Sequence, residues 1–392
     1  KSYPSFKQTL GTILDKSESK NSTEKIGNSM RAFFLHLRNI DWGIAGIAIL
    51  LSVFGSVSLY SSSIGLEDFG NFQKQIVFLL MGIVLMLGIS YFDWRLVRND
   101  PYFLFILWII GVIALAGLFI LAPEIRGIKS WYKLGNISID PIEYIKIVLL
   151  VLMAKYFSLR HIEMYRIRHI LLSGLYFGIP ILLIFLQPDL GSASLLAILW
   201  IVLLLVSGIK LRHFLVLLMI GAVVFSFGWG VLLQDYQKGR IISFLEPELD
   251  PLGIGWSQAQ SKVAIGNGGM FGQGIGQGTQ TQYGFLSEPQ TDFIFAATAE
   301  EFGLLGVTLL LSLFIILLYR MFKIGIKAQS NFPRLFVAGF ATLFIAQFFV
   351  NVGMNLGLLP IIGLSLPLVS YGGSSLLAMY AGLGVLLSIK TH

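Results

Sequence analysis

Residues 102–122 read YFLFILWIIGVIALAGLFILA, twenty-one positions without a charged side chain. A helix of about 20 apolar residues crosses the hydrocarbon core of a bilayer. Nine further runs are also predominantly apolar. They lie near residues 43–60, 76–92, 142–154, 170–186, 192–207, 214–233, 302–318, 335–352 and 374–388. The sequence therefore predicts an all-α polytopic membrane protein with about ten transmembrane helices.

The composition supports the same fold class. Of the 392 residues, 55% are hydrophobic and 12% charged, against about 25% charged in soluble domains. The mean hydropathy is +0.78. A soluble chain of this size cannot bury so much apolar surface in one core, which excludes a soluble enzyme and a nucleic-acid binder. Because the chain has no cysteine, disulfides and thiolate metal sites are excluded too.

The charge distribution predicts the orientation in the membrane. With ten spans and a cytoplasmic N-terminus, 20 of the 28 Lys and Arg residues fall inside and 8 outside, whereas 7 of the 21 acidic residues fall inside and 14 outside. Positive charge gathers on the cytoplasmic side of membrane proteins. Both termini are therefore expected in the cytoplasm, with residues 1–41 as a polar tail and 42–390 as the membrane domain.

One extracytoplasmic loop, residues 235–291 between spans 7 and 8, is far longer than the other connections. Loops of this length are usually functional or disordered. Its glycine-dense stretch, residues 266–278, has two interpretations. It is either a flexible linker or a re-entrant loop in which glycine lets the backbone approach a substrate in a cavity.

The outer side offers carboxylates and lysines for chemistry. The chain has no GxxxxGK[ST], GxGxxG or HExxH motif, and all five histidines fall on the predicted inner side, so no nucleotide cofactor is expected. Asp292 precedes an apolar run, where it either caps a helix or serves as a base. Glu143 and Lys146 lie one helical turn apart, as an ion pair or as part of a site. Asp189 either caps the next helix or joins that site.

These residues, with Glu300 inside an apolar segment, are expected to frame one polar cavity, since charges at such depth usually face water or a partner. A carboxylate base beside a lysine suits deprotonation of a sugar hydroxyl while the cation neutralises a departing phosphate. A transporter would also use buried charges. Transporters more often show repeated halves with matching broken helices, and no convincing repeat is present.

Five sequence elements, in order, resemble the SEDS family of RodA-, FtsW- and SpoVE-type proteins. They are GIKSW (127–131) with DPIEYIK (140–146), QPDLGS (187–192), QSKVAIGNGG (260–269), TDFIFA (291–296) with EEFG (300–303), and PLVSYGGSS (367–375). The resemblance covers residues 41–390. Two positions depart from it: Ser130 stands where the family has Arg, and DPIE stands where it has QPSE.

The resemblance implies a peptidoglycan glycosyltransferase that polymerises lipid II on the outer face of the bacterial cytoplasmic (inner) membrane, with undecaprenyl pyrophosphate as leaving group. Asp292 carries over as general base, and Glu143 and Lys146 as its catalytic partners. A divalent cation, Mg²⁺ or Mn²⁺, has Asp292 and Glu143 as candidate ligands. The residues expected to bind substrate or pyrophosphate are Lys129, Arg240, Lys262, Gln260, Asp189, Glu300, Ser370 and Ser374.

The expected partners are a class B penicillin-binding protein, the nascent glycan strand and membrane lipids. The short tail after the last span favours the RodA-like type, which acts in cell-wall elongation and cell shape, over the division type. Two other functions stay open for such a chain: a lipid II flippase and a non-catalytic scaffold for a transpeptidase. A glycan polymerisation assay separates all three.

Overall fold

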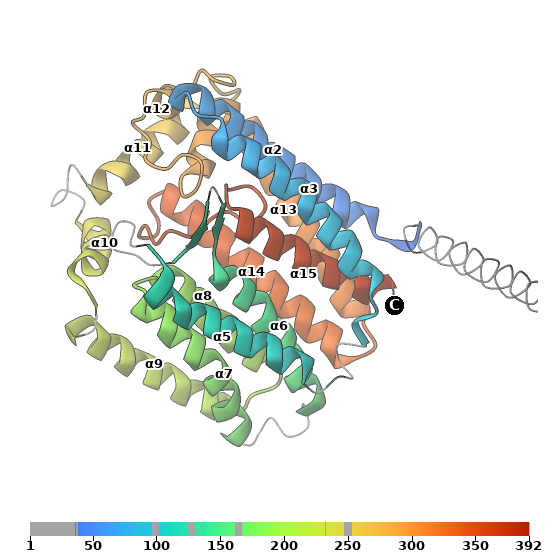
Figure 1. The fold of residues 1–392 in the computed structure, drawn as a ribbon. Coiled ribbons are helices and arrows are strands. Elements are labelled where there is room, and N and C mark those ends of the chain that lie inside the picture. The colour runs from blue at the N-terminus through green and yellow to red at the C-terminus, as the bar shows by residue number, and fades with distance from the viewer. Residues whose placement is uncertain are drawn as a thin grey trace, which may run out of the picture.

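Ten long helices form one bundle in the computed structural model (Figure 1), which describes residues 36, 38–95, 100, 102–123, 130–135, 137–160, 167–231, 233–246 and 253–391. Each helix contains most or all of one predicted apolar run, which confirms the fold class. The helices are α2 (Trp42–Leu66), α3 (Gly70–Tyr91), α5 (Phe103–Leu121), α6 (Pro141–Arg160), α7 (Ile167–Leu186), α8 (Leu190–Val206), α9 (Leu211–Val231), α13 (Ile294–Lys327), α14 (Asn331–Asn355) and α15 (Gly373–Thr391).

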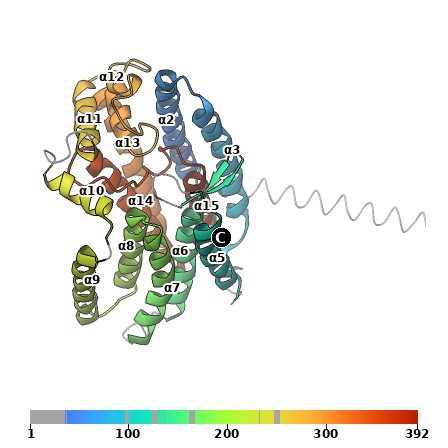
Figure 2. The same ribbon diagram turned by 60° about the vertical axis from the view of Figure 1, so that its left-hand side comes forward.

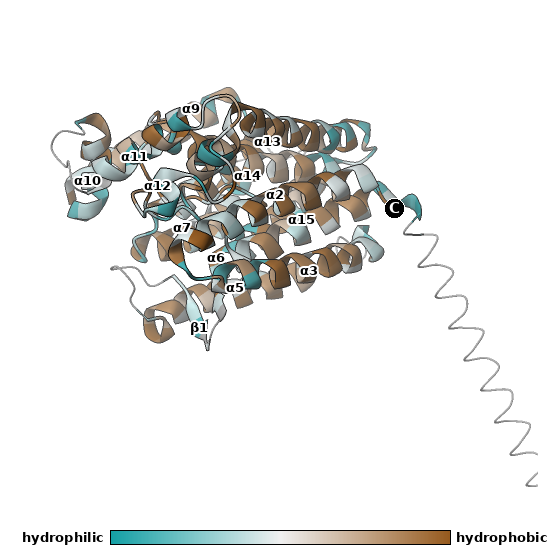
Figure 3. Ribbon diagram, turned by 90° about the horizontal axis from the view of Figure 1, so that it is seen from above, coloured by the Kyte–Doolittle hydropathy of each residue, from teal (hydrophilic) through white to brown (hydrophobic). Residues whose placement is uncertain are grey.

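Within the described residues, eight of these helices are long and apolar enough to cross a membrane. The other two are α8, which is apolar but has 17 residues, and α6, which carries Glu143, Lys146, Lys155 and Arg160. Hydrophobic residues extend along most of each helix, whereas hydrophilic residues lie toward the helix ends and in the connections (Figure 3). The orientation with both termini in the cytoplasm stays a prediction.

The core of the bundle is built around α14, which packs against α6, α8 and α13. Four phenylalanines spaced four residues apart, and therefore on one face, are each at most 2% exposed: Phe332, Phe336, Phe340 and Phe344. Their successive ring centroids lie 5.1–6.3 Å apart. By contrast, α9 lies at the edge of the bundle (Figure 2), and Gly228 is its one buried residue.

The long loop is folded rather than extended. It holds α10 (Asp235–Leu245), α11 (Ile254–Asn267) and the short α12 (Thr279–Gln282); residues 247–252 lie outside the described part. A hairpin that the sequence analysis did not predict, β1 (Tyr132–Leu134) paired antiparallel with β2 (Ile137–Ile139), precedes α6. Both features lie at the end of the bundle that carries the candidate site.

The eighth span differs from the prediction. The apolar run begins at Phe302, but α13 already begins at Ile294 and is broken at Gly303, whose φ of 62° and ψ of −162° are not helical. Such a conformation is open essentially to glycine alone. The hydropathy pattern misses the first turns because Glu300 and Glu301 interrupt it, although both side chains are buried.

The glycine-dense stretch supplies the hydrogen bonds that the break removes. The amides of Gln273 and Gly274 donate to the carbonyls of Glu300 and Glu301, at 2.9 and 3.0 Å. The amides of Leu304 and Leu305 donate to the carbonyls of Gly269 and Met270. Backbone groups freed in a membrane helix need such partners. The interpretation of this stretch as a flexible linker is therefore wrong.

We expect Gly272→Ala to destabilise the protein, because a Cβ at this position would lie 2.1 Å from the carbonyl oxygen of Glu301 and the residue has a φ of +80°. Crowding and left-handed strain together cost about 2–4 kcal/mol, or roughly 2–5 °C in melting temperature for a chain of this length. Gly266→Ala is the matched control, since no atom lies within 4 Å of its Cβ. Equal melting temperatures for the two variants would contradict this role of Gly272.

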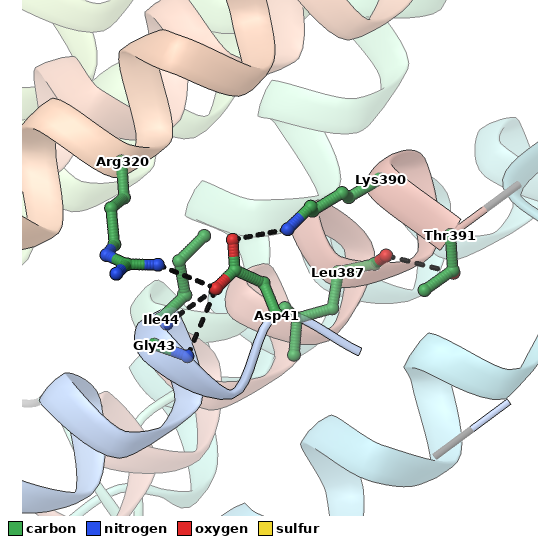
Figure 4. Close-up of polar contacts among 7 residues, drawn as sticks. All are labelled: Asp41, Gly43, Ile44, Arg320, Leu387, Lys390 and Thr391. Atoms are coloured by element: carbon green, nitrogen blue, oxygen red, sulfur yellow. Dashed lines mark hydrogen bonds and ion pairs between the residues drawn. The ribbon is translucent and has the colours of Figure 1, made fainter. Parts of the chain in front are cut away.

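At the opposite end of the bundle, Asp41 joins three helices (Figure 4). Its Oδ1 accepts from Arg320 at 2.9 Å and its Oδ2 from Lys390 at 2.6 Å, while Oδ1 also accepts the amides of Gly43 and Ile44 and so caps α2. Burial acts to raise the pKa of Asp41, but the hydrogen bond and charge of Lys390, the charge of Arg320 and the Ile44 amide outweigh it. The pKa of Asp41 is held below 3.8.

Asp41→Asn should therefore lower the melting temperature at pH 7. A carboxyl whose folded-state pKa is depressed adds stability above its unfolded pKa, about 3.9, and this stability is lost as the pH falls through the folded pKa. The difference between wild type and variant should begin to shrink as the pH falls below about 4 and should disappear below the folded-state pKa of Asp41. A difference that persists unchanged to pH 3 would show that the charge of Asp41 is not what joins these helices.

Candidate active site

The first turn of α6 holds a buried ion pair. Lys146 Nζ lies 2.6 Å from Glu143 Oε1, and the two residues are 1% and 8% exposed. Their spacing of three places them on one helix face. Glu143 Oε2 is buried and, among the described residues, has no hydrogen-bond partner. The pair therefore keeps one carboxylate oxygen available for a ligand.

Asp140, which the sequence analysis did not select, starts this helix. Its Oδ1 accepts the amide of Ile142 at 2.9 Å, and its own amide donates to Ser374 Oγ at 3.0 Å. Burial, together with the charges of Glu143 and Asp189, raises the pKa of Asp140 to about 8, although Lys146 and the Ile142 amide act to lower it. The signal in the sequence is the change from QPSE to DPIE, which adds a carboxyl here.

Asp189 approaches this group from α8. Its side chain accepts the Ser192 amide at 3.0 Å and caps the helix, so the capping interpretation is confirmed. Its charge acts on both Asp140 and Tyr236. Tyr236 of α10 donates to the Pro188 carbonyl at 2.7 Å, and Arg240 lies over the Tyr236 ring at 5.7 Å. Arg240 is thus held next to the Asp189 turn.

Asp292 lies in the turn before α13 and is half-buried. The helix N-cap position is taken by Phe293, whose side chain makes no cap bond, so Asp292 lies one residue before the N-cap. The turn is held through its backbone. Asn351 and Asn355 donate to the Asp292 carbonyl at 3.0 and 2.9 Å, and Ser370 Oγ donates to the Thr291 carbonyl at 2.8 Å.

The segment between α14 and α15, residues 356–372, connects these two groups. A Cβ on Gly363 would lie 3.7 Å from Asp292 Oδ2, and one on Gly191 would lie 2.6 Å from the Ile362 carbonyl oxygen and 3.4 Å from Asp189 Oδ1. The same connection contains Ser370, which bonds the Thr291 carbonyl, and it leads into α15, where Ser374 accepts the Asp140 amide. Asp292 and Asp189 therefore both lie close to residues 362–363.

Three more predicted residues have defined positions. Lys262 of α11 is exposed and lies against Gly357, where a Cβ would meet its Nζ at 2.8 Å. Gln260 is half-buried on the same helix. Glu300, which is fully buried, accepts the amides of Gln280 and Thr281 at 2.7 and 3.0 Å and both threonine hydroxyls of α12.

The bonds of Glu300 use both of its carboxylate oxygens, so its predicted contact with substrate is replaced by a structural role. Lys129 lies outside the described residues. Ser130, at the position of the family arginine, is 4% exposed and brings no positive charge.

No group of three or more His, Asp or Glu side chains suited to a metal ion occurs within the described ranges. The available donors, chiefly Glu143 Oε2, instead fit an ion that is held by one or two carboxylates and by substrate phosphates, as is common for Mg²⁺.

The comparison with known proteins matches this architecture. Residues 41–392 match the FtsW/RodA/SpoVE family, described as cell cycle proteins. The chain is 36% identical over 346 residues to the peptidoglycan glycosyltransferase MrdB of Escherichia coli (strain K12), covering 88% of this chain and 92% of MrdB.

Two solved structures share the fold. One belongs to a peptidoglycan synthase complex that coordinates polymerization and crosslinking, with a TM-score of 0.76, 32% identity and coverage of 90% of this chain and 97% of that one. The other is the rod shape determining protein RodA of Thermus thermophilus, with a TM-score of 0.66, 29% identity and coverage of 90% and 96%.

The chain therefore belongs to the FtsW/RodA/SpoVE family. Together with its apolar helices, this makes it a multi-pass protein of the bacterial inner membrane.

Asp140→Asn should change how stability depends on pH. Because the folded-state pKa of Asp140 is raised to about 8, the wild type should lose stability as the pH rises from about 4 to 8. Asparagine keeps the acceptor for Ile142 and the backbone bond to Ser374 but carries no charge. Between pH 5 and 9, the melting temperature of the variant should thus fall less than that of the wild type. Parallel curves for the two proteins would contradict a raised pKa of Asp140.

Proposed function

We propose that this protein polymerises lipid II into glycan strands on the outer face of the inner membrane, with Asp292 as general base and undecaprenyl pyrophosphate as leaving group. Family membership and the glycosyltransferase relative support the reaction class. The observations that support the assignment of the site are that Asp292 and Asp189 both lie close to residues 362–363, and that the charges of Asp189, Glu143 and Lys146 all act on Asp140.

In this mechanism the Asp292 carboxylate takes the proton from the acceptor GlcNAc 4-hydroxyl. The oxygen attacks the anomeric carbon of the donor MurNAc while the bond to the pyrophosphate breaks. A single displacement inverts the α linkage of the donor into the β linkage of the product. The bonds from Asn351, Asn355 and Ser370 hold the Asp292 turn rigid, which keeps the base oriented without cost at the moment of reaction.

Lys146 supplies positive charge for the departing pyrophosphate. Its burial places it in a low-dielectric setting, where a fixed charge acts more strongly than in water. Glu143 positions this ammonium through the 2.6 Å bond. Arg240 and Lys262 extend the positive charge along the surface of the site, and Gln260 adds a polar side chain beside Lys262.

A divalent cation, Mg²⁺ or Mn²⁺, fits this donor set as an ion shared between Glu143 or Asp292 and the pyrophosphate. When bound, such an ion neutralises phosphate charge. The residues described above retain their own roles: Asp292 moves the proton, and Glu143 holds Lys146.

The proposed partner is a class B penicillin-binding protein that cross-links the strands made here. Its support is the similarity to a chain of a peptidoglycan synthase complex that coordinates polymerization and crosslinking. The similarity to MrdB and to a rod shape determining protein supports a role in elongation and cell shape.

Asp292→Asn should lower the rate of glycan polymerisation from labelled lipid II by roughly 10²–10⁴-fold, the usual contribution of a general base, while the protein stays folded. Asp235→Asn, which removes an exposed carboxylate of α10, is the matched control and should polymerise at the wild-type rate. Full activity of Asp292→Asn would contradict the assignment of Asp292 as the general base. If the variant translocates lipid II and even wild type makes no polymer, the flippase explanation replaces ours.

The ion pair can be tested by a double variant. Lys146→Met alone leaves Glu143 buried and uncompensated, which costs about 3–5 kcal/mol of stability. Adding Glu143→Gln should restore most of the melting temperature but not the polymerisation rate. A stable double variant with wild-type activity would mean that the pair serves the fold alone, whereas a stable, inactive one supports its part in the reaction.

A further inference from the structure

A polar cavity lies at the opposite end of the bundle from Asp292. It has a volume of about 750 Å³, in the range of small-ligand sites. Its position follows from α13: Arg320, in the cavity wall, lies 26 residues beyond Ile294 on the same helix. Counted from Leu304, beyond the break at Gly303, Arg320 lies 16 residues along α13, which at 1.5 Å per residue places the cavity roughly 24 Å from the break. No part of the proposed reaction uses it.

The cavity wall is strongly basic. Among the described residues, five cationic side chains from three segments line it, against one carboxylate, Asp41; they are Arg95, Arg320, Lys323, Lys327 and Lys390. Both oxygens of Asp41 already bind cations, Oδ1 that of Arg320 and Oδ2 that of Lys390 (Figure 4). Positive charge at the cytoplasmic side of a membrane protein is expected in general. Here, however, positive charges from separate helices converge on one cavity. This additional feature points to an anionic ligand.

The surroundings of the cavity match the interface of a membrane. Tyr319 lines the cavity and is 64% exposed, and aromatic side chains of this type concentrate at the level of the headgroups. Phe322 and Ile326, on the neighbouring stripe of α13, are 41% and 78% exposed. An anion bound at Lys323 and Lys327 would thus lie directly beside an apolar surface. This arrangement suits a headgroup that carries acyl chains better than it suits a soluble ion.

We propose that this cavity binds a phosphate group, supplied by the headgroup of an anionic phospholipid in the leaflet opposite the active site. Lys323 and Lys327, one turn apart and both exposed, contact the phosphate, while Arg320 and Lys390 remain with Asp41. Salt weakens the binding, because exposed charges are screened over about 8 Å at physiological ionic strength.

Native mass spectrometry of the full chain, titrated with phosphatidylglycerol or with phosphatidylcholine of the same acyl chains, tests this site. Wild type should bind phosphatidylglycerol preferentially, and Lys323→Gln with Lys327→Gln should weaken the first binding step about tenfold or more. Lys210→Gln with Arg212→Gln, two exposed cations at the start of α9, is the control and should bind as wild type does.

Equal phosphatidylglycerol binding by both double variants would overturn the proposal. Inorganic phosphate is the second probe, and at matched concentration it should neither bind measurably nor displace the lipid. Binding of inorganic phosphate that depends on the two lysines, without lipid binding, would overturn the assignment to a phospholipid. Unchanged elution and melting temperature of both variants confirm that the comparison concerns folded protein.

Discussion

The break in α13 at Gly303 is the constraint on which the outer end of the molecule depends. A helix cannot lose backbone hydrogen bonds inside a membrane without replacing them, and here residues 269–274 replace them on both sides of the break. That requirement brings the end of α11 and the following glycines against the first turns of α13. It also brings α12 onto Glu300, whose carboxylate caps it. The two buried residues Glu300 and Glu301 thus stabilise this part of the fold.

The same arrangement explains why Asp292 is suited to chemistry. Its turn lies at the start of the broken helix, and the backbone of the turn is fixed by side chains of α14 and by Ser370. Glu143 and Lys146 belong to a different helix, and Asp189 links the two groups, because it lies close to Ile362 and its charge acts on Asp140 together with theirs. A rigid bundle therefore positions a base and a cation from elements far apart in sequence.

The sequence predicted the ten helices because long apolar runs are a local signal. It placed a helix directly after Asp292 but began the spanning run only at Phe302, since Glu300 and Glu301 interrupt the run and their partners come from residues more than 18 positions away. It also left open whether the glycines form a linker, because the carbonyls they meet become visible only in three dimensions. For the candidate site, the motif resemblance selected Asp292, Glu143 and Lys146, whereas Asp140 was missed because its neighbours Asp189 and Ser374 lie on other helices.

The central claim is that one site, around Asp292, transfers sugar from a polyprenyl pyrophosphate. The most direct measurement is the release of undecaprenyl pyrophosphate by the purified protein with its penicillin-binding partner, counted against disaccharide incorporated from labelled lipid II. The account predicts one pyrophosphate released for each disaccharide added, with β-linked product, and loss of both when Asp292 is replaced. Lipid II consumption without release, or release that does not need Asp292, would contradict it.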